Sequence, residues 1–123
     1  MSSELIKLPY PPSVNGIYGH TSRGPYLAHK VKAYRRDVLV SCLEQRVVPW
    51  RKTEPLGITI NLHPPTKAKR DVDNPAKSVL DALEAAGVVD DDSQFHRMLI
   101  QKCEVVRGGF VTVEIYDLLN SGD

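Results

Sequence analysis

The segment Leu56-Gly-Ile-Thr-Ile-Asn-Leu62 alternates apolar residues with small or polar ones. Successive side chains of a strand point to opposite faces, so the alternation predicts a strand with one apolar face. Pro64-Pro65 predicts the end of this strand, because proline cannot donate a hydrogen bond to a neighbouring strand. The basic run Lys67-Ala-Lys-Arg70 that follows is typical of a loop.

A short helix is predicted directly after this loop. Residues 74–86 carry an apolar stripe at helical spacing. Asn74 and Pro75 fit the N-cap and the first helical position, and Gly87 fits the residue that follows the last turn. The chain therefore passes from a strand to a helix that is marked at both ends.

The rest of the chain supplies the other elements of the predicted fold. The pattern predicts a strand at 5–8, a long loop at 13–26, a helix at 28–47, and strands at 98–106 and 110–115 that form a hairpin through Gly108-Gly109. The order β-α-β-α-β-β predicts an α+β fold, with one mixed sheet and two main helices, and we expect residues 1–123 to form a single domain.

Composition narrows the class of protein. The chain has 123 residues, of which 41% are hydrophobic and 25% charged, as in ordinary globular proteins. It contains neither an apolar run of about 20 residues nor a signal-peptide pattern, so we expect a cytoplasmic protein with no membrane partner. The net charge of +1 does not by itself indicate nucleic-acid binding, so that hypothesis depends on where the charges lie.

Two acidic groups flank the predicted short helix. Asp71 and Asp73 lie two residues apart, so in an extended segment both carboxylates would point to the same side. Asp90-Asp-Asp92 follows the helix and could return toward them through the turn at Gly87. Each helical residue adds about 1.5 Å of length, so the helix by itself separates the two acidic groups. The loop after the helix would have to cover this distance to bring them together.

Converging carboxylates would need a cation to offset their repulsion. A site made only of carboxylate oxygens suits Mg²⁺, or Mn²⁺, rather than zinc. Such an ion can align a phosphodiester, activate water and stabilise the leaving oxygen, which favours hydrolysis of a nucleic-acid backbone. The alternative is structural, because aspartates also stabilise helix starts and form solvated turns.

Basic residues near the acidic groups could bind phosphates. Lys77 falls one helical turn beyond Asp73, where it could contact a phosphate, although it could equally form a surface pair with Asp81. Two further sets could bind DNA or could simply be solvated surface: Lys67, Lys69 and Arg70 before the aspartates, and Lys30, Lys32, Arg35 and Arg36 on the first helix.

Taken together, these pieces resemble the RusA family of Holliday-junction resolvases. The similar pieces, in the same order, are Leu8-Pro-Tyr-Pro-Pro-Ser13, Arg70-Asp-Val-Asp-Asn74, Lys77, Asp81-Ala-Leu83, Ala86-Gly87, Asp91-Asp92 and Gly108-Gly109. The combination of D-x-D-N-x-x-K, a short helix, a glycine and paired aspartates is more specific than any single piece.

The resemblance implies a magnesium-dependent homodimer that cuts four-way DNA junctions symmetrically during recombination and repair. It implies that Asp71, Asp73 and Asp92 are essential carboxylates, that Asp91 is a further metal-site residue, and that Lys77 is the catalytic lysine. A two-fold dimer suits this substrate, because a two-fold junction needs two equivalent cuts. Two alternatives remain: a nucleic-acid-binding module without catalysis, and a metal nuclease that acts on flaps or single strands.

Overall fold

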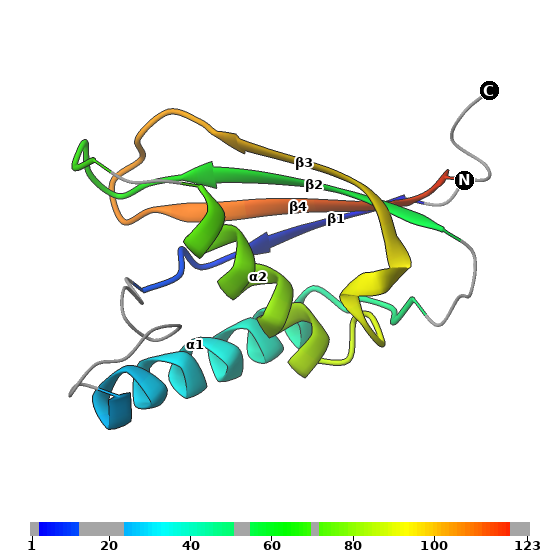
Figure 1. Ribbon diagram of the computed structural model, residues 1–123, viewed down its shortest axis with the longest axis horizontal. Helices are drawn as coiled ribbons and strands as arrows, with labels where there is room; N and C mark the ends of the chain where they lie inside the picture. Colours follow the sequence, from blue (N-terminus) through cyan, green and yellow to red (C-terminus); the bar gives the residue numbers. More distant parts are fainter. Residues whose placement is uncertain (1–2, 13–23, 51–54, 70–71, 119–123) are drawn as a thin grey trace.

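The computed structural model describes residues 3–12, 24–50, 55–69 and 72–118. Four strands form one mixed sheet, and two helices pack on one of its faces (Figure 1). This architecture confirms the predicted α+β class and the predicted element order. The elements are β1 (Ser3–Leu8), α1 (Gly24–Glu44), β2 (Leu56–His63), α2 (Asp73–Ala85), the 3₁₀ turn η1 (Asp92–Gln94), β3 (Phe95–Lys102) and β4 (Phe110–Asp117).

The strand order differs from the predicted hairpin. The order across the sheet is β1-β4-β2-β3, with β2 parallel to β3 and antiparallel to β4. The crossover through α2 makes β3 the parallel neighbour of β2, so β4 occupies the other side of β2. Gly108 and Gly109 do make the turn before β4, with φ of 86° and 69°, but the strands on either side of this turn are not paired with each other.

The core lies between the apolar face of the sheet and the two helices. Ile58 and Ile60 of β2 are fully buried, as are Val79 and Leu83 of α2 and Val38 of α1. Complete burial of side chains of this size stabilises the fold by about 1.5–3 kcal/mol each. The core therefore holds α2 firmly against the sheet while its opposite face meets solvent.

The first helix begins earlier and ends earlier than its sequence pattern predicts. Residues 24–26, expected in the loop, belong to α1, and the rest of that expected loop lies outside the described residues. The helix ends at Glu44 rather than at Val47. Arg46 adopts a left-handed backbone with φ of 58°, which cannot continue a right-handed helix. None of the described helices is long and apolar enough to cross a membrane.

The start of α2 also lies two residues earlier than the prediction. Val72 occupies the N-cap position without a side-chain capping bond, and Asp73 is the first helical residue, so the expected cap at Asn74 is wrong. Pro75 still fits, because N–H groups of the first turn have no partner within the helix. The predicted end is confirmed: Gly87 has φ of 78°, and its N–H donates to the Glu84 carbonyl at 3.0 Å.

Candidate active site

The N-terminal end of α2 carries one part of the predicted site. Asp73 is exposed at the first helical position, and Val72 packs against the core, as expected. The backbone of Val72 is helical, so the condition of an extended segment, under which Asp71 and Asp73 would point to the same side, is not met at Val72. Asp71 and Arg70 lie outside the described residues.

The C-terminal end of α2 carries a second acidic group. Ligand oxygens of Glu84, Asp91 and Asp92 all lie within 4.8 Å of one another, and all three residues are exposed. Glu84 belongs to the last turn of α2, whereas the two aspartates lie at the start of η1. We call these three residues the acidic cluster. Asp90, the first residue of the aspartate triplet, is exposed but is not part of the cluster.

Buried residues between α2 and η1 bring the acidic cluster together. Val88 and Val89 are almost completely buried, so the chain turns inward directly after Gly87. The Trp50 N–H donates to the Val88 carbonyl at 2.7 Å, which ties this turn to the segment that follows α1. The turn therefore returns the chain to the last turn of α2, where Glu84 lies.

A capping box holds the aspartates in place. The Asp91 side chain accepts a hydrogen bond from the Ser93 N–H at 2.9 Å, and Gln94 Oε1 accepts one from the Asp91 N–H at 3.2 Å. Gln94 Oε1 also accepts a hydrogen bond from the Asp90 N–H at 2.7 Å. The backbone hydrogen bond from Ser93, followed by a side-chain hydrogen bond with Asp92, lowers the pKa of Asp91. Asp91 is therefore a carboxylate at neutral pH, as a cation ligand must be.

The acidic cluster fits a hard divalent cation. It offers only carboxylate oxygens, the donors that Mg²⁺ and Mn²⁺ prefer. Each carboxylate has two oxygens, so the capping bond to Asp91 leaves an acceptor available for an ion. The exposure of all three residues also leaves room for water and for a phosphodiester.

Within one chain, the structure does not bring Asp73 to the acidic cluster. Asp73 and Glu84 lie eleven residues apart on the same straight helix, which separates them by about 16 Å along its axis. The conditional expectation that all these carboxylates converge is therefore not met by a single subunit. A cation at the cluster would be far from Asp73 of the same chain.

Lys77 lies between the two ends of the helix. Its Nζ atom is 3.6 Å from Oδ2 of Asp81, in the surface pair that the sequence allows, and the Arg35 guanidinium on α1 approaches the same oxygen at 4.0 Å. The side chain of Lys77 is 54% exposed, so this weak pair leaves it accessible to a ligand.

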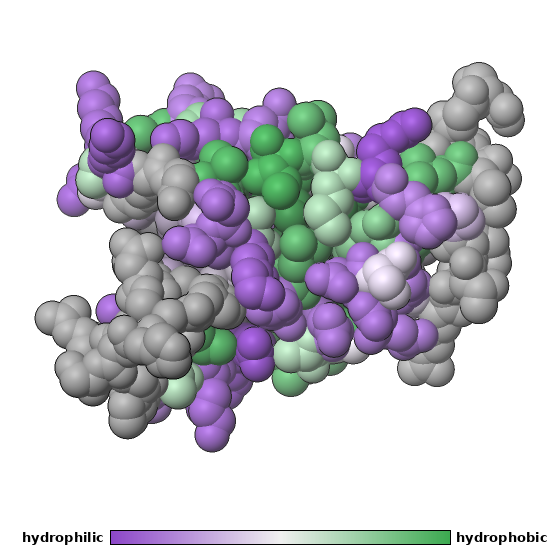
Figure 2. Space-filling model, in the orientation of Figure 1, coloured by the Kyte–Doolittle hydropathy of each residue, from purple (hydrophilic) through white to green (hydrophobic). Residues whose placement is uncertain are grey.

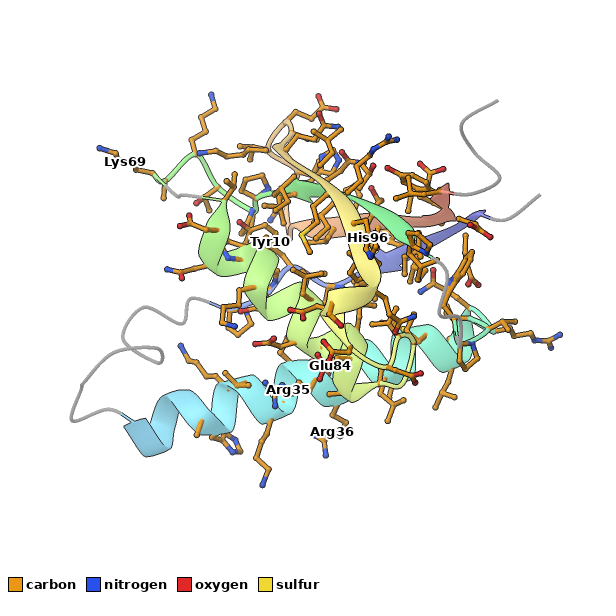
Figure 3. The ribbon with its side chains drawn as sticks, turned by 45° about the vertical axis from the view of Figure 1, so that its right-hand side comes forward. Tyr10, Arg35, Arg36, Lys69, Glu84 and His96 are labelled. Carbon is orange, nitrogen blue, oxygen red and sulfur yellow. The ribbon has the colours of Figure 1, made fainter. Side chains whose placement is uncertain are left out.

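The remaining predicted basic residues lie in two places. Lys67 and Lys69 are exposed in the loop before α2, and Figure 3 draws Lys69 far from Glu84. On α1, Lys32 and Arg36 are exposed, whereas Lys30 and Arg35 are half-buried. Figure 3 draws Arg35 beside α2, in agreement with its approach to Asp81. Positive charge therefore accompanies both ends of the helix.

Two residues of this region escaped the sequence analysis. Glu84 is a single acidic residue at an exposed helical position, so nothing in its pattern marks it as a ligand. Gln94 did carry a signal, because Asp91-x-x-Gln94 matches a capping box. That pattern could have placed Asp91 at the start of a helical turn.

The sequence of this chain is similar to those of a known family of nucleases. The family described as Endodeoxyribonuclease RusA matches residues 9–116. The crossover junction endodeoxyribonuclease RusA of Shigella sonnei (strain Ss046) is 32% identical over 120 residues, covering 98% of this chain and 99% of the relative. The protein of the same name from Escherichia coli (strain K12) has the same identity and coverage. That of Enterobacteria phage HK97 is 32% identical over 118 residues, covering 96% of this chain and 98% of the relative.

Proposed function

Because the chain belongs to the RusA family of endodeoxyribonucleases, we propose that it is a magnesium-dependent endonuclease that resolves Holliday junctions by paired, symmetric nicks. Its role would be in DNA recombination and repair, and its place the cytoplasm, where bacterial DNA lies. The observation that carries the proposal is the acidic cluster at the end of α2, in a chain that matches this family over nearly its whole length.

The carboxylates at both ends of α2 hold Mg²⁺ in this proposal, and Mn²⁺ could replace it. The residues are Asp71, Asp73, Asp91 and Asp92, with Glu84 added by its contact with the aspartates. The bound ion supplies activation of water and stabilisation of the leaving oxygen. The carboxylates position the ion, and their exposure gives a DNA strand access to it.

Lys77 and the other basic residues act on the DNA itself. The ammonium of Lys77 stabilises negative charge that develops on the phosphate during cleavage. Lys67, Lys69 and Arg70 bind the DNA backbone near Asp73, and Lys30, Lys32, Arg35 and Arg36 bind it along α1. Exposure of Lys67, Lys69 and Arg36 supports this role, because phosphate contacts need accessible cations.

A homodimer resolves the separation of the carboxylates. If two chains pair around a two-fold axis with their α2 helices antiparallel, the N-terminal end of one helix lies beside the C-terminal end of the other. Asp73 of one subunit then joins the acidic cluster of the second subunit, and each dimer contains two such shared sites. Two equivalent sites match the two cuts that a four-way junction requires.

Cleavage assays on matched DNA substrates test this function. Wild-type protein and Asp73→Asn are incubated with four-way junction, flap, duplex and single-stranded DNA, in magnesium or in EDTA. Asp37→Asn, which changes an exposed aspartate on α1, is the matched control. We expect paired nicks in the junction that require magnesium and Asp73 and that persist in Asp37→Asn. A preference for flaps, or binding without cleavage, would contradict the proposal.

A further inference from the structure

The two edges of the sheet differ in how their backbone groups are satisfied. At the β1 edge, the Lys7 N–H donates to Gln45 Oε1 at 2.8 Å, and Gln45 Nε2 donates to the Lys7 carbonyl at 2.7 Å. One side chain from the end of α1 thus covers both outward backbone groups of Lys7. This arrangement protects the β1 edge from pairing with another strand.

In the middle of β3, no side chain of the described residues covers the backbone groups of Met98 and Ile100 in this way. β3 is the last strand of the sheet and pairs only with β2 there. The Cys103 N–H donates to the Leu62 carbonyl at 2.7 Å, so backbone groups of alternate residues, including Leu99, point toward β2. Those of Met98 and Ile100 point away from the sheet.

The side chains in the middle of this edge are apolar, whereas edge strands often carry charged residues along their length. Met98 is 43% exposed and Leu99 is 49% exposed, and Ile100 is half-buried beside them. Figure 2 shows apolar surface gathered over the middle of β3. We call residues Met98, Leu99 and Ile100 the β3 patch.

The β3 patch is complementary to itself in an antiparallel pair. With a two-fold axis at Leu99, Met98 of one copy faces Ile100 of the other, and each such pair can exchange two backbone hydrogen bonds. The two Leu99 side chains then face each other. A shift of one residue would place Met98, whose backbone groups point outward, opposite Gln101, whose backbone groups point toward β2, so the pair could not exchange backbone hydrogen bonds.

This pairing also agrees with the positions of the carboxylates. The first turn of α2, which contains Asp73, lies near the C-terminal end of β2 in both ribbon views (Figures 1 and 3). Asp91 and Asp92 lie just before β3, at its N-terminal end. Because β2 and β3 are parallel, antiparallel pairing of two β3 strands brings these opposite ends together.

We propose that two copies of the chain associate through their β3 edges, antiparallel around Leu99, to form one continuous eight-stranded sheet. The occupant of the β3 edge is thus a second copy of this chain. The inference rests on the proposed homodimeric nuclease and names the surface that forms the dimer. The pairing places Asp73 of each copy at the same end of the joined sheet as the acidic cluster of the other.

Disulfide crosslinking tests the interface without measuring cleavage. Leu99→Cys is prepared in a Cys103→Ser background, while Cys42 is buried and stays. The matched control is Leu5→Cys in the same background, because Leu5 is an exposed apolar residue on the β1 edge. Opposed residues of a non-hydrogen-bonded pair lie about 4.5 Å apart at Cα, within the range that a disulfide spans.

We expect Leu99→Cys to form covalent dimer on mild oxidation at least about tenfold faster than Leu5→Cys, because paired thiols have a high effective concentration. Equal rates in a protein that light scattering shows to be dimeric would overturn the β3 interface and leave the proposed function intact. A monomeric mass would overturn the interface and the homodimer together, while magnesium-dependent junction cleavage would still report the nuclease separately.

A charged substitution provides a second test. Leu99→Glu places two carboxylates opposite each other at the axis, and exposure of Leu99 makes the change tolerable in a single chain. We expect it to raise the dimer dissociation constant at least about tenfold in analytical ultracentrifugation, the equivalent of 1.4 kcal/mol. Leu5→Glu should leave the constant unchanged, and an equal effect of both variants would overturn the proposal.

Discussion

The two ends of α2 hold their carboxylates in different ways. At the N-terminal end, Asp73 is exposed beside Val72, which makes no side-chain capping bond. At the C-terminal end, Glu84, Asp91 and Asp92 converge within 4.8 Å, and a capping box fixes Asp91. One end is an organised cluster of carboxylates, whereas the other presents a separate carboxylate.

This difference shows that α2 acts as a spacer. Its buried side is anchored in the core by Val79 and Leu83, so the two ends cannot approach each other without unfolding the helix. A site that uses both ends must therefore draw them from two chains. Substitutions at each end therefore probe separate parts of the site.

Asp92→Asn should reduce junction cleavage by more than about 100-fold, because it removes a charged ligand from the cluster. Asp73→Asn should have a similar effect from the other end of the helix. Single-turnover cleavage at saturating enzyme measures both. Asp90→Asn is the control, because Asp90 is adjacent in sequence but outside the cluster. An equal loss in Asp90→Asn would show that the cluster is not the site.

Lys77→Ala should reduce the cleavage rate by about 100-fold, because it removes a donor that stabilises developing charge. Asp81→Asn should change the rate by less than about threefold, because an exposed helical ion pair contributes only about 0.3–0.5 kcal/mol. The same single-turnover assay separates the two variants. If they lose equal activity, Lys77 acts through its pair with Asp81 and not on the DNA.

Glu84→Gln should raise the magnesium concentration for half-maximal cleavage by about tenfold, because the residue contributes one ligand of several. Titration of cleavage with magnesium, accompanied by calorimetry of magnesium binding, measures the shift. Glu44→Gln at the exposed end of α1 is the control. An unchanged titration in Glu84→Gln would remove this residue from the metal site.

The smallest effect concerns the capping role of Asp91 in metal-free protein. Its pKa lies below the ordinary value of 3.8, so the carboxylate stabilises the fold above that value and loses this contribution as pH falls through the folded pKa. Asp91→Ala should therefore unfold at a lower temperature than wild type at neutral pH, and the difference should shrink in acid. Thermal unfolding in EDTA measures this, with Asp90→Ala as the control, because Asp90 contributes only its backbone N–H and both hydrogen bonds to the Asp91 side chain remain.

Several parts of this account could be predicted from local sequence. The alternation from Leu56 to Leu62 predicts β2, and the left-handed position of Gly87 follows from its place after an apolar helical stripe. Each signal acts over a few residues, and burial of the same side chains then stabilises the predicted element. The sequence also marks the aspartate triplet 90–92 after the helix, and the family resemblance then points to Asp91 and Asp92.

Other parts depend on contacts between distant segments. The glycine pair Gly108-Gly109 predicts a turn but does not indicate which strand pairs with β4. The predicted hairpin of β3 with β4 is therefore wrong. Glu84 joins Asp91 and Asp92 only because Val88 and Val89 are drawn into the core. Placing Asp73 away from the cluster required knowing that α2 is one uninterrupted helix.

Mixing two inactive variants tests most directly whether the site is shared between subunits. Asp73→Asn and Asp92→Asn are each inactive as homodimers, but a heterodimer would contain one site with both aspartates intact. With random exchange of subunits, half the dimers are heterodimers with one working site, so the mixture should regain about a quarter of wild-type nicking activity. If activity does not return although subunit exchange is demonstrated, each site is built from one chain and the shared site is contradicted.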